Sequence, residues 1–220
     1  MTETAGHTKS RPEDLRALSE GLFRSVGRAA VSGNVLEIRH PAAPMLNPKF
    51  LHSAGYDFGV LIGLNKGSKP YSGQPIMCDT AELPFQASVF SMVLLHHVIS
   101  DGMESELNEA VRVLARDGVL IILGINRLGW RFRFQGRLRP LPGIAPLKVK
   151  SCLDRLDMTM QGFAGAGFFG LQRPVFMSAG IAGLGAPIAD VVLLQARHNN
   201  GPAMTPSRFR KLDSGVVQSA

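Results

Sequence analysis

Short runs of consecutive apolar residues alternate with amphipathic stretches along most of this 220-residue chain. Two runs, Val89–Val98 and Val119–Ile125, are apolar at nearly every position, as in parallel strands that are covered on both faces. Between them, Glu104–Ala115 carries its apolar residues on one stripe, which predicts a helix that ends close to Gly118. A strand, a helix and a strand with short connections predict a right-handed crossover within a largely parallel sheet.

Further elements are predicted on both sides of this unit. An N-terminal helix opens at Ser10 and Pro12, because the apolar residues that follow recur at spacings of three and four. The basic segment Asn126–Pro146 is rich in Gly and Pro and is predicted to be irregular. The remaining predictions are strands at Val31–Ile38, Val60–Leu64, Pro75–Cys78, Met158–Phe163 and Asp190–Ala196, and a short helix at Val149–Leu156.

The predicted organisation is one domain with two extensions. A chain of this length can bury one self-sufficient core. We expect residues 1–30 to form a helix packed on the domain, residues 31–198 to form the domain itself, and residues 199–220 to form a flexible basic tail.

Basic charge is concentrated in one part of the chain. There are 24 Lys plus Arg against 17 Asp plus Glu, a formal net charge of +7, and no acidic residue lies between Gly118 and Leu153. Such a segment favours an anionic partner, such as nucleic acid, acidic lipid headgroups or phosphorylated metabolites, and is equally compatible with a solvated basic surface. The arginines through which we expect an anionic partner to bind are Arg127, Arg131, Arg133, Arg137 and Arg139.

Several classes of protein are excluded by composition. Cys78 and Cys152 are the only cysteines, so a disulfide framework and a zinc-ligand cluster are not expected, and no metal site is predicted. The N-terminus lacks the apolar stretch of a signal peptide. The most apolar window, residues 174–189, is shorter than the roughly 20 residues that span a bilayer, and Gly and Pro interrupt it. We therefore expect a cytoplasmic protein without a transmembrane segment.

A longer motif begins at Cys78. Asp79 is followed by Leu-Pro-Phe, then by an apolar strand that ends in His, then by a helix that reads Glu-x-x-Arg-Val-Leu and by a second apolar strand. Over about Cys78–Trp130 the sequence resembles the class I S-adenosylmethionine-dependent methyltransferases of the type 11 domain group. The resemblance is weaker at the last strand and poor before Ile76.

The resemblance implies an α/β fold of the Rossmann-like type. Its sheet would have seven mostly parallel strands, with helices on both faces and the last strand antiparallel. S-adenosylmethionine would bind across the carboxyl ends of the first strands, the usual ligand position in doubly wound sheets. Methyl transfer then requires little chemistry from the protein beyond positioning, because the sulfonium is already activated.

Most of the candidate site residues follow from matching this sequence to the motifs of the family. Glu37 matches the acidic residue that ends the first strand, and Asn65 stands where the family has the acid that binds the ribose. Asp79 and Thr80 match the position that meets the adenine amino group, although an ordinary turn-forming Asp is the alternative. The remaining candidates are Leu95 and His96, which match residues that flank the sulfonium, and His97 beside them.

The paired histidines are the candidate catalytic residues. His96 and His97 could orient an acceptor or take its proton as a general base, or they could be one core histidine and one strand-end histidine. Because neighbouring side chains on a strand face opposite sides, we expect at most one of them to point towards the cofactor.

The segment after Glu37 departs from the family, because it has two prolines and no glycine. We hypothesise that Arg39 or His40 replaces the contacts that a glycine-rich backbone makes with the methionine part of the cofactor. Two functions therefore stay open. The first is methyl transfer to a small-molecule or lipid-like substrate, and the second is a catalytically silent methyltransferase fold that acts as a binding or assembly partner through its basic surface.

The rim after the fifth strand is the remaining candidate region. Asn126 and Arg127 are expected where substrates approach the sheet. Trp130, Phe132 and Phe134 would form a lid over them, or an amphipathic edge whose rings pack and whose charges are solvated.

Overall fold

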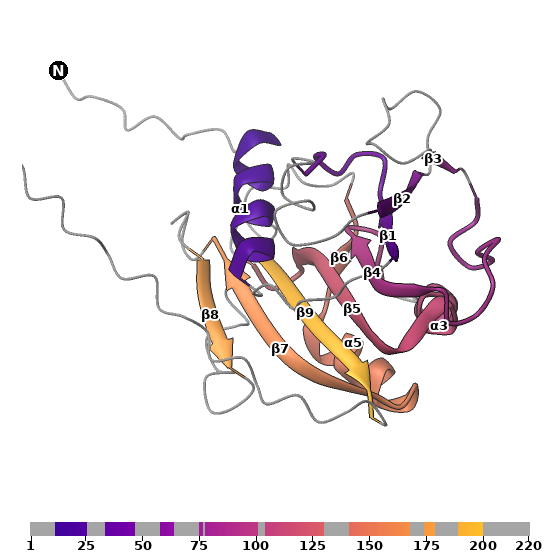
Figure 1. Cartoon of the computed structure of the whole chain (residues 1–220). Coiled ribbons are helices and arrows are strands. Elements are labelled where there is room, and N and C mark those ends of the chain that lie inside the picture. Colours follow the sequence, from indigo (N-terminus) through magenta and orange to yellow (C-terminus); the bar gives the residue numbers. More distant parts are fainter. Residues whose placement is uncertain are drawn as a thin grey trace, which may run out of the picture.

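The fold is known from a computed structural model, which describes residues 12–25, 34–46, 58–63, 75–76, 78–100, 104–129, 141–167, 174–178 and 189–199. Nine strands form one sheet in the order β3-β2-β1-β4-β5-β9-β7-β8, and β6 pairs with β5 (Figure 1). The helices are α1 (Pro12–Ser25), α3 (Glu104–Val113) and α5 (Pro146–Arg155). The strands are β1 (Asn34–Arg39), β2 (Phe58–Gly63), β3 (Pro75–Ile76), β4 (Phe90–His96), β5 (Leu114–Asn126), β6 (Gly143–Ile144), β7 (Met158–Ala166), β8 (Pro174–Ser178) and β9 (Val191–His198).

The chain fills the sheet in two directions from its centre. It runs outwards from β1 through β2 to β3, returns to β4 on the other side of β1, and continues to β5, with all of these pairings parallel. The strand order therefore reverses between β1 and β4. In a doubly wound sheet, ligands bind outside the carboxyl ends of the strands at this reversal.

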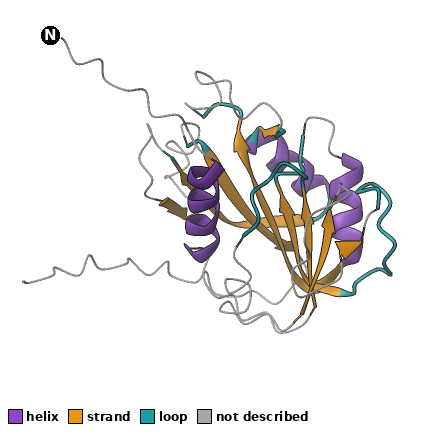
Figure 2. Cartoon of the chain, turned by 90° about the horizontal axis from the view of Figure 1, so that it is seen from above, coloured by secondary structure: helices purple, strands orange, loops and turns teal. Residues whose placement is uncertain are grey.

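Helices cover both faces of the sheet and enclose two apolar cores (Figure 2). On one face, α1 lies against β7, β8 and β9, and its Leu18 and Leu22 belong to the same core as Met92 and Leu94 of β4. On the other face, α3 and α5 pack against the alternate residues of the same strands, which include Val93. The strands of the sheet centre are apolar on both faces for this reason, as the sequence predicted.

The predicted antiparallel last strand is β9, but the number of strands differs from the predicted seven. The described residues contain nine strands, of which β3 and β6 have two residues each. Two strands run against the others, because β9 pairs antiparallel with β5 and β8 pairs antiparallel with β7 at the sheet edge. The periodicity of the sequence did not reveal β8, which lies in the Gly- and Pro-rich window, nor β6, which lies in the segment expected to be irregular.

The end of α3 also differs from its prediction. The helix ends at Val113 rather than beyond it, and β5 already begins at Leu114, which pairs with Phe90. The carbonyls of Arg112 and Val113 accept hydrogen bonds from Ser88 and Val89 at the start of β4. Since these bonds satisfy helix-end carbonyls, the turn does not need a helix-ending glycine. Gly118 lies within β5.

The prediction for the tail, residues 200–220, lies outside the described residues. For the predicted N-terminal helix, the described part is α1, whose apolar face contacts β7, β8 and β9.

Candidate functional site

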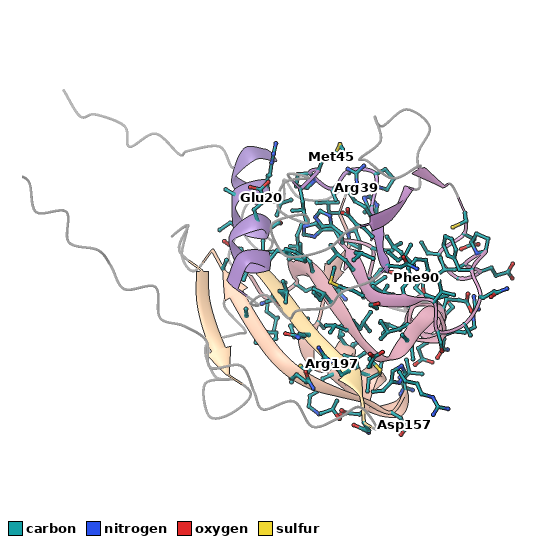
Figure 3. All side chains as sticks on the ribbon, viewed as in Figure 1. Glu20, Arg39, Met45, Phe90, Asp157 and Arg197 are labelled. Atoms are coloured by element: carbon teal, nitrogen blue, oxygen red, sulfur yellow. The ribbon has the colours of Figure 1, made fainter. Side chains whose placement is uncertain are left out.

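Polar side chains converge at the carboxyl ends of β1 and β4. Arg39 ends β1 and His96 ends β4, and the two residues are register partners in the parallel pair. Register partners point to the same face of a sheet, and so do residues two apart on one strand. Glu37, Arg39 and His96 therefore share the face that α1 covers. We call these three residues and His97 the strand-end cluster. Figure 3 shows Arg39 at the opposite end of the sheet from Arg197.

Glu37 and His96 are bonded to each other within the protein. The Oε1 atom of Glu37 lies 2.8 Å from Nδ1 of His96, and both side chains are almost fully buried, with exposed fractions of 4% and 0%. The other ring nitrogen of His96, Nε2, is buried and has no hydrogen-bond partner among the described residues. The acid that was predicted to meet the cofactor thus holds a histidine.

His97 lies beside His96 in a left-handed backbone conformation. Its φ of +55° is uncommon for a non-glycine residue, and its N–H donates to the carbonyl of Leu123 at 2.7 Å. The usual alternation of side chains does not apply in this conformation. The ring centroids of His96 and His97 lie 5.0 Å apart, so the two rings are neighbours. That at most one of them points towards the cofactor stays a prediction.

Burial controls the charge of the histidines around this point. The His97 ring is buried, and within the part of the chain that the structure describes neither of its nitrogens has a hydrogen-bond partner. Burial, and then the nearby His96 and His40, lower the pKa of His97 well below its usual value, so the ring is neutral at physiological pH. Partial burial also lowers the pKa of His40.

The loop after β1 uses its backbone donors internally. The N–H of His40 donates to the carbonyl of His96, and the N–H groups of Ala42 and Ala43 donate to Nδ1 and to the carbonyl of His40. Pro41 and Pro44 have no N–H group. From His40 to Pro44, no backbone donor is left for a ligand. A backbone cradle of the kind that a glycine-rich loop forms is therefore absent from this segment.

Arg39 is held by the same loop. Its side chain is buried, and Nη1 donates to the carbonyl of Ala43 at 3.0 Å. The Nε atom is buried without a partner. One guanidinium donor thus remains available for a ligand, while another fixes the loop.

Asp79 and Thr80 occupy the turn after β3. The Oδ1 atom of Asp79 accepts the N–H of Ala81 at 2.9 Å, and the Asp79 side chain is exposed. This is an Asx turn, the structural role that was weighed for Asp79 from the sequence. The Thr80 side chain is buried.

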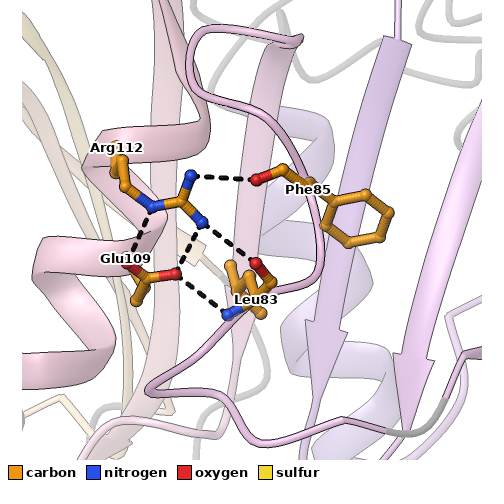
Figure 4. A network of polar contacts seen from close by, with 4 residues as sticks. All are labelled: Leu83, Phe85, Glu109 and Arg112. Carbon is orange, nitrogen blue, oxygen red and sulfur yellow. Dashed lines mark hydrogen bonds and ion pairs between the residues drawn. The ribbon is translucent and has the colours of Figure 1, made fainter.

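Three hydrogen bonds fasten the following loop to α3 (Figure 4). The guanidinium of Arg112 donates to the carbonyls of Leu83 and Phe85 at 3.0 and 2.9 Å, and pairs with Glu109 at 2.7 Å. Glu109 in turn accepts the N–H of Leu83 at 2.9 Å. The hydrogen bonds from Arg112 lower the pKa of Glu109, and Glu109 raises the pKa of Arg112. We call Glu109 and Arg112 the loop clamp.

Sequence reasoning missed the role of the loop clamp. Its signal was present, because an acid and an arginine three residues apart on a helix lie on one face. The Leu-Pro-Phe segment upstream presents the N–H of Leu83 and the carbonyls of Leu83 and Phe85 to that face. The clamp holds the loop that leads from Asp79 to β4.

Other candidates are not brought into the strand-end cluster. The Leu95 side chain lies on the opposite face of β4, in the core under α3 and α5. Asn126 is fully buried, where its amide donates to the carbonyl of Ala189 and its Oδ1 accepts the N–H of Leu128, so it joins β5 to the start of β9. Predictions for Asn65, Trp130, Arg131, Phe132, Arg133, Phe134, Arg137 and Arg139 lie outside the described residues, and Arg127 is exposed within them.

A pocket of about 220 Å³ lies between α3 and α5, lined by Glu104, Asn108, Cys152, Arg155 and Leu156. None of its lining residues is a candidate site residue. Within the described ranges, no group of three His, Cys, Asp or Glu side chains could hold a metal ion. None of the described helices is long and apolar enough to cross a membrane.

Comparisons with known proteins identify the fold. Neither a family model nor a curated protein matches the sequence. A solved methyltransferase of Thermotoga maritima, described as S-adenosylmethionine-dependent and as a possible histamine N-methyltransferase, matches with a TM-score of 0.56 at 14% identity, covering 84% of this chain and 90% of that one. An S-adenosylmethionine-dependent methyltransferase of Archaeoglobus fulgidus matches with a TM-score of 0.54 at 12% identity, covering 85% and 94%.

A third similar structure contains ligands. It is the 1,6-didemethyltoxoflavin-N1-methyltransferase of Burkholderia thailandensis, with bound 1,6-didemethyltoxoflavin and S-adenosylhomocysteine. The TM-score is 0.53 at 14% identity, and the match covers 86% of this chain and 80% of that one. The protein has the fold of the class I S-adenosylmethionine-dependent methyltransferases.

Proposed function

We propose that the protein is an S-adenosylmethionine-dependent methyltransferase that acts on a small-molecule or lipid-like acceptor. The observation that carries this proposal is the strand-end cluster. Buried polar side chains without a full set of partners lie at the reversal point of the sheet, where doubly wound folds bind their ligands. The fold itself supports the reaction class.

The polar groups around the reversal point fit part of the cofactor. We assign Arg39 Nε to the carboxylate of the methionine portion, since a guanidinium donor suits a carboxylate and the loop backbone has no donor to offer. Asp79 keeps a second carboxylate oxygen beyond its Asx turn, which suits the adenine amino group or a ribose hydroxyl. Bound S-adenosylmethionine would supply an activated methyl group, and these side chains would orient it.

Calorimetric titration with S-adenosylmethionine, and separately with S-adenosylhomocysteine, tests the proposal. We expect micromolar binding by the wild type and binding at least about tenfold weaker by Asp79→Asn, which keeps an oxygen for Ala81 but removes the charge. Glu82→Gln is the matched control, because Glu82 is an exposed acid on the same turn. The proposal is refuted if neither ligand releases heat on binding or raises the Tm of the protein at millimolar concentration.

A silent methyltransferase fold is the second candidate, and one observation favours it. Glu37 and Arg39, the two charged residues of the first strand end, are buried and bonded within the protein. If cofactor binding is absent, this candidate is favoured and the basic surface becomes the place to look for a partner. The cytoplasmic location and an anionic partner for the basic segment stay predictions.

A further inference from the structure

The contact between Glu37 and His96 defines the state of the imidazole. With Glu37 as a carboxylate, which only accepts hydrogen bonds, the 2.8 Å contact places a ring proton on Nδ1. Nε2 is then the ring atom that can carry the lone pair. This atom is closed off from solvent and has no hydrogen-bond partner. A proton that reaches Nε2 must therefore come from a bound molecule or from a neighbouring group.

The surroundings of His96 differ from those of an ordinary structural ion pair. Among the described residues, three buried ring nitrogens have no partner: Nε2 of His96 and both nitrogens of His97. A buried polar atom that stays unsatisfied destabilises the fold. His97 also has a φ of +55°, in a region of backbone conformation that costs energy for a bulky residue. Unsatisfied groups and backbone strain concentrate at functional sites, and this one lies at the reversal point of the sheet.

We propose that Glu37 and His96 form a base dyad for the methyl acceptor, which rests on the function proposed above. His96 is the base, and Nε2 takes the proton of the acceptor. Glu37 is a positioning residue, because it holds Nδ1–H and so keeps the lone pair on Nε2. Its negative charge also stabilises the imidazolium that forms.

The proposal restricts the class of acceptor. The acceptor atom X must carry a removable proton. A hydroxyl, a phenol or the N–H of a heterocyclic ring therefore fits, and a tertiary amine or a thioether does not. The X–H bond breaks, its proton moves to Nε2, and its electron pair stays on X to form the bond to the methyl carbon. Bound S-adenosylmethionine supplies the methyl group, and its sulfur keeps the electron pair of the broken C–S bond. The proton passes from Nε2 to water only when the site opens to release the product.

Histidine tautomers measured by 15N NMR test the dyad without cofactor or acceptor. We expect the His96 ring of the wild type to carry its proton on Nδ1 and to have a bare Nε2. His96→Gln assigns the signals by their loss. Glu37→Leu should shift the ring towards the Nε2–H tautomer. Glu37→Gln, whose amide oxygen still accepts a hydrogen bond, should keep Nδ1–H. The glutamine variant is the one to measure if the leucine variant does not fold. An Nε2–H tautomer or a doubly protonated ring in the wild type would overturn the dyad.

Kinetics with a series of acceptors supplies the second test. We expect kcat to fall about 10²–10⁴-fold in His96→Gln and less in Glu37→Gln, with KM changed less than kcat. The loss should be smallest for acceptors whose own X–H group is most acidic, since these need the base least. Equal losses across the series would indicate a structural role and overturn the dyad. Cofactor binding by the wild type reports separately on the proposed function, so the two proposals can fail independently.

Discussion

Replacing Arg112 by alanine should release the loop that joins the turn at Asp79 to β4. The variant loses the two hydrogen bonds to the carbonyls of Leu83 and Phe85 and the pairing with Glu109. Each hydrogen bond to a backbone carbonyl contributes about 0.5–1.5 kcal/mol net. The ion pair adds little, because the side chain of Arg112 is 38% exposed and solvent screens the charges. The free energy of unfolding should fall by about 2 kcal/mol.

Thermal unfolding measures this loss. A fall of about 2 kcal/mol lowers the Tm of a domain of this size by about 4–8 °C. Lys150→Ala is the matched control, because it removes an exposed ion pair with Asp154 within α5, and it should change stability by less than about 0.5 kcal/mol. Arg112→Lys should recover only part of the loss, since an ammonium cannot reproduce the fork of bonds.

A local measurement separates the loop from the rest of the fold. Hydrogen exchange of the Leu83 and Phe85 amides should accelerate more than exchange in β4 when Arg112 is replaced, since the loop opens before the sheet does. The reasoning fails if Arg112→Ala melts within about 1 °C of Lys150→Ala, or if exchange in the loop is unchanged.

Three further predictions concern stability. The buried His97 ring binds a proton less readily in the folded chain than in the unfolded one, whose His pKa is near 6.5. Stability should therefore be full above pH 6.5 and fall below it, by about 1.4 kcal/mol from about pH 7.5 to about pH 5.5. His97→Asn, which accepts a positive φ, should remove this part of the pH dependence in denaturant titrations. Gly167→Ala should cost about 1–3 kcal/mol by the same assay, because Gly167 has a φ of +84° and a Cβ there would lie 2.8 Å from Oδ2 of Asp190; a neutral result would contradict the strain. Leu22→Ala in α1 should cost about 2–5 kcal/mol, since Leu22 is fully buried against the sheet; a loss below about 1 kcal/mol would mean that α1 contributes little to the core.

The layered architecture could be predicted because its signals are local. The apolar runs of β4 and β5 report burial on both faces, and the spacing of apolar residues in α1 and α3 reports one buried face, whatever the rest of the chain does. The type and order of these elements already imply a parallel α/β sheet. Element ends were less predictable. The end of α3 depends on bonds from Ser88 and Val89, which lie more than twenty residues upstream.

The candidate site was predictable only as a set of residues. Sequence motifs pointed to Glu37, His96 and Asp79, yet they did not show that Glu37 bonds to His96, 59 residues away in the chain. That contact exists because β1 and β4 pair in parallel with Arg39 opposite His96. This register places the side chains of Glu37, Arg39 and His96 on one face of the sheet. A shift of one residue would have turned His96 to the other face.

The sequence by itself thus determined which segments become strands and helices, since burial periodicity is a property of neighbouring residues. The tertiary structure decided which polar groups meet. Strand register, the positive φ of His97 and the internal bonding of the loop after β1 are set by contacts between distant segments. The chemistry of the strand-end cluster depends on those contacts, because a lone pair on Nε2 of His96 requires a carboxylate placed at Nδ1.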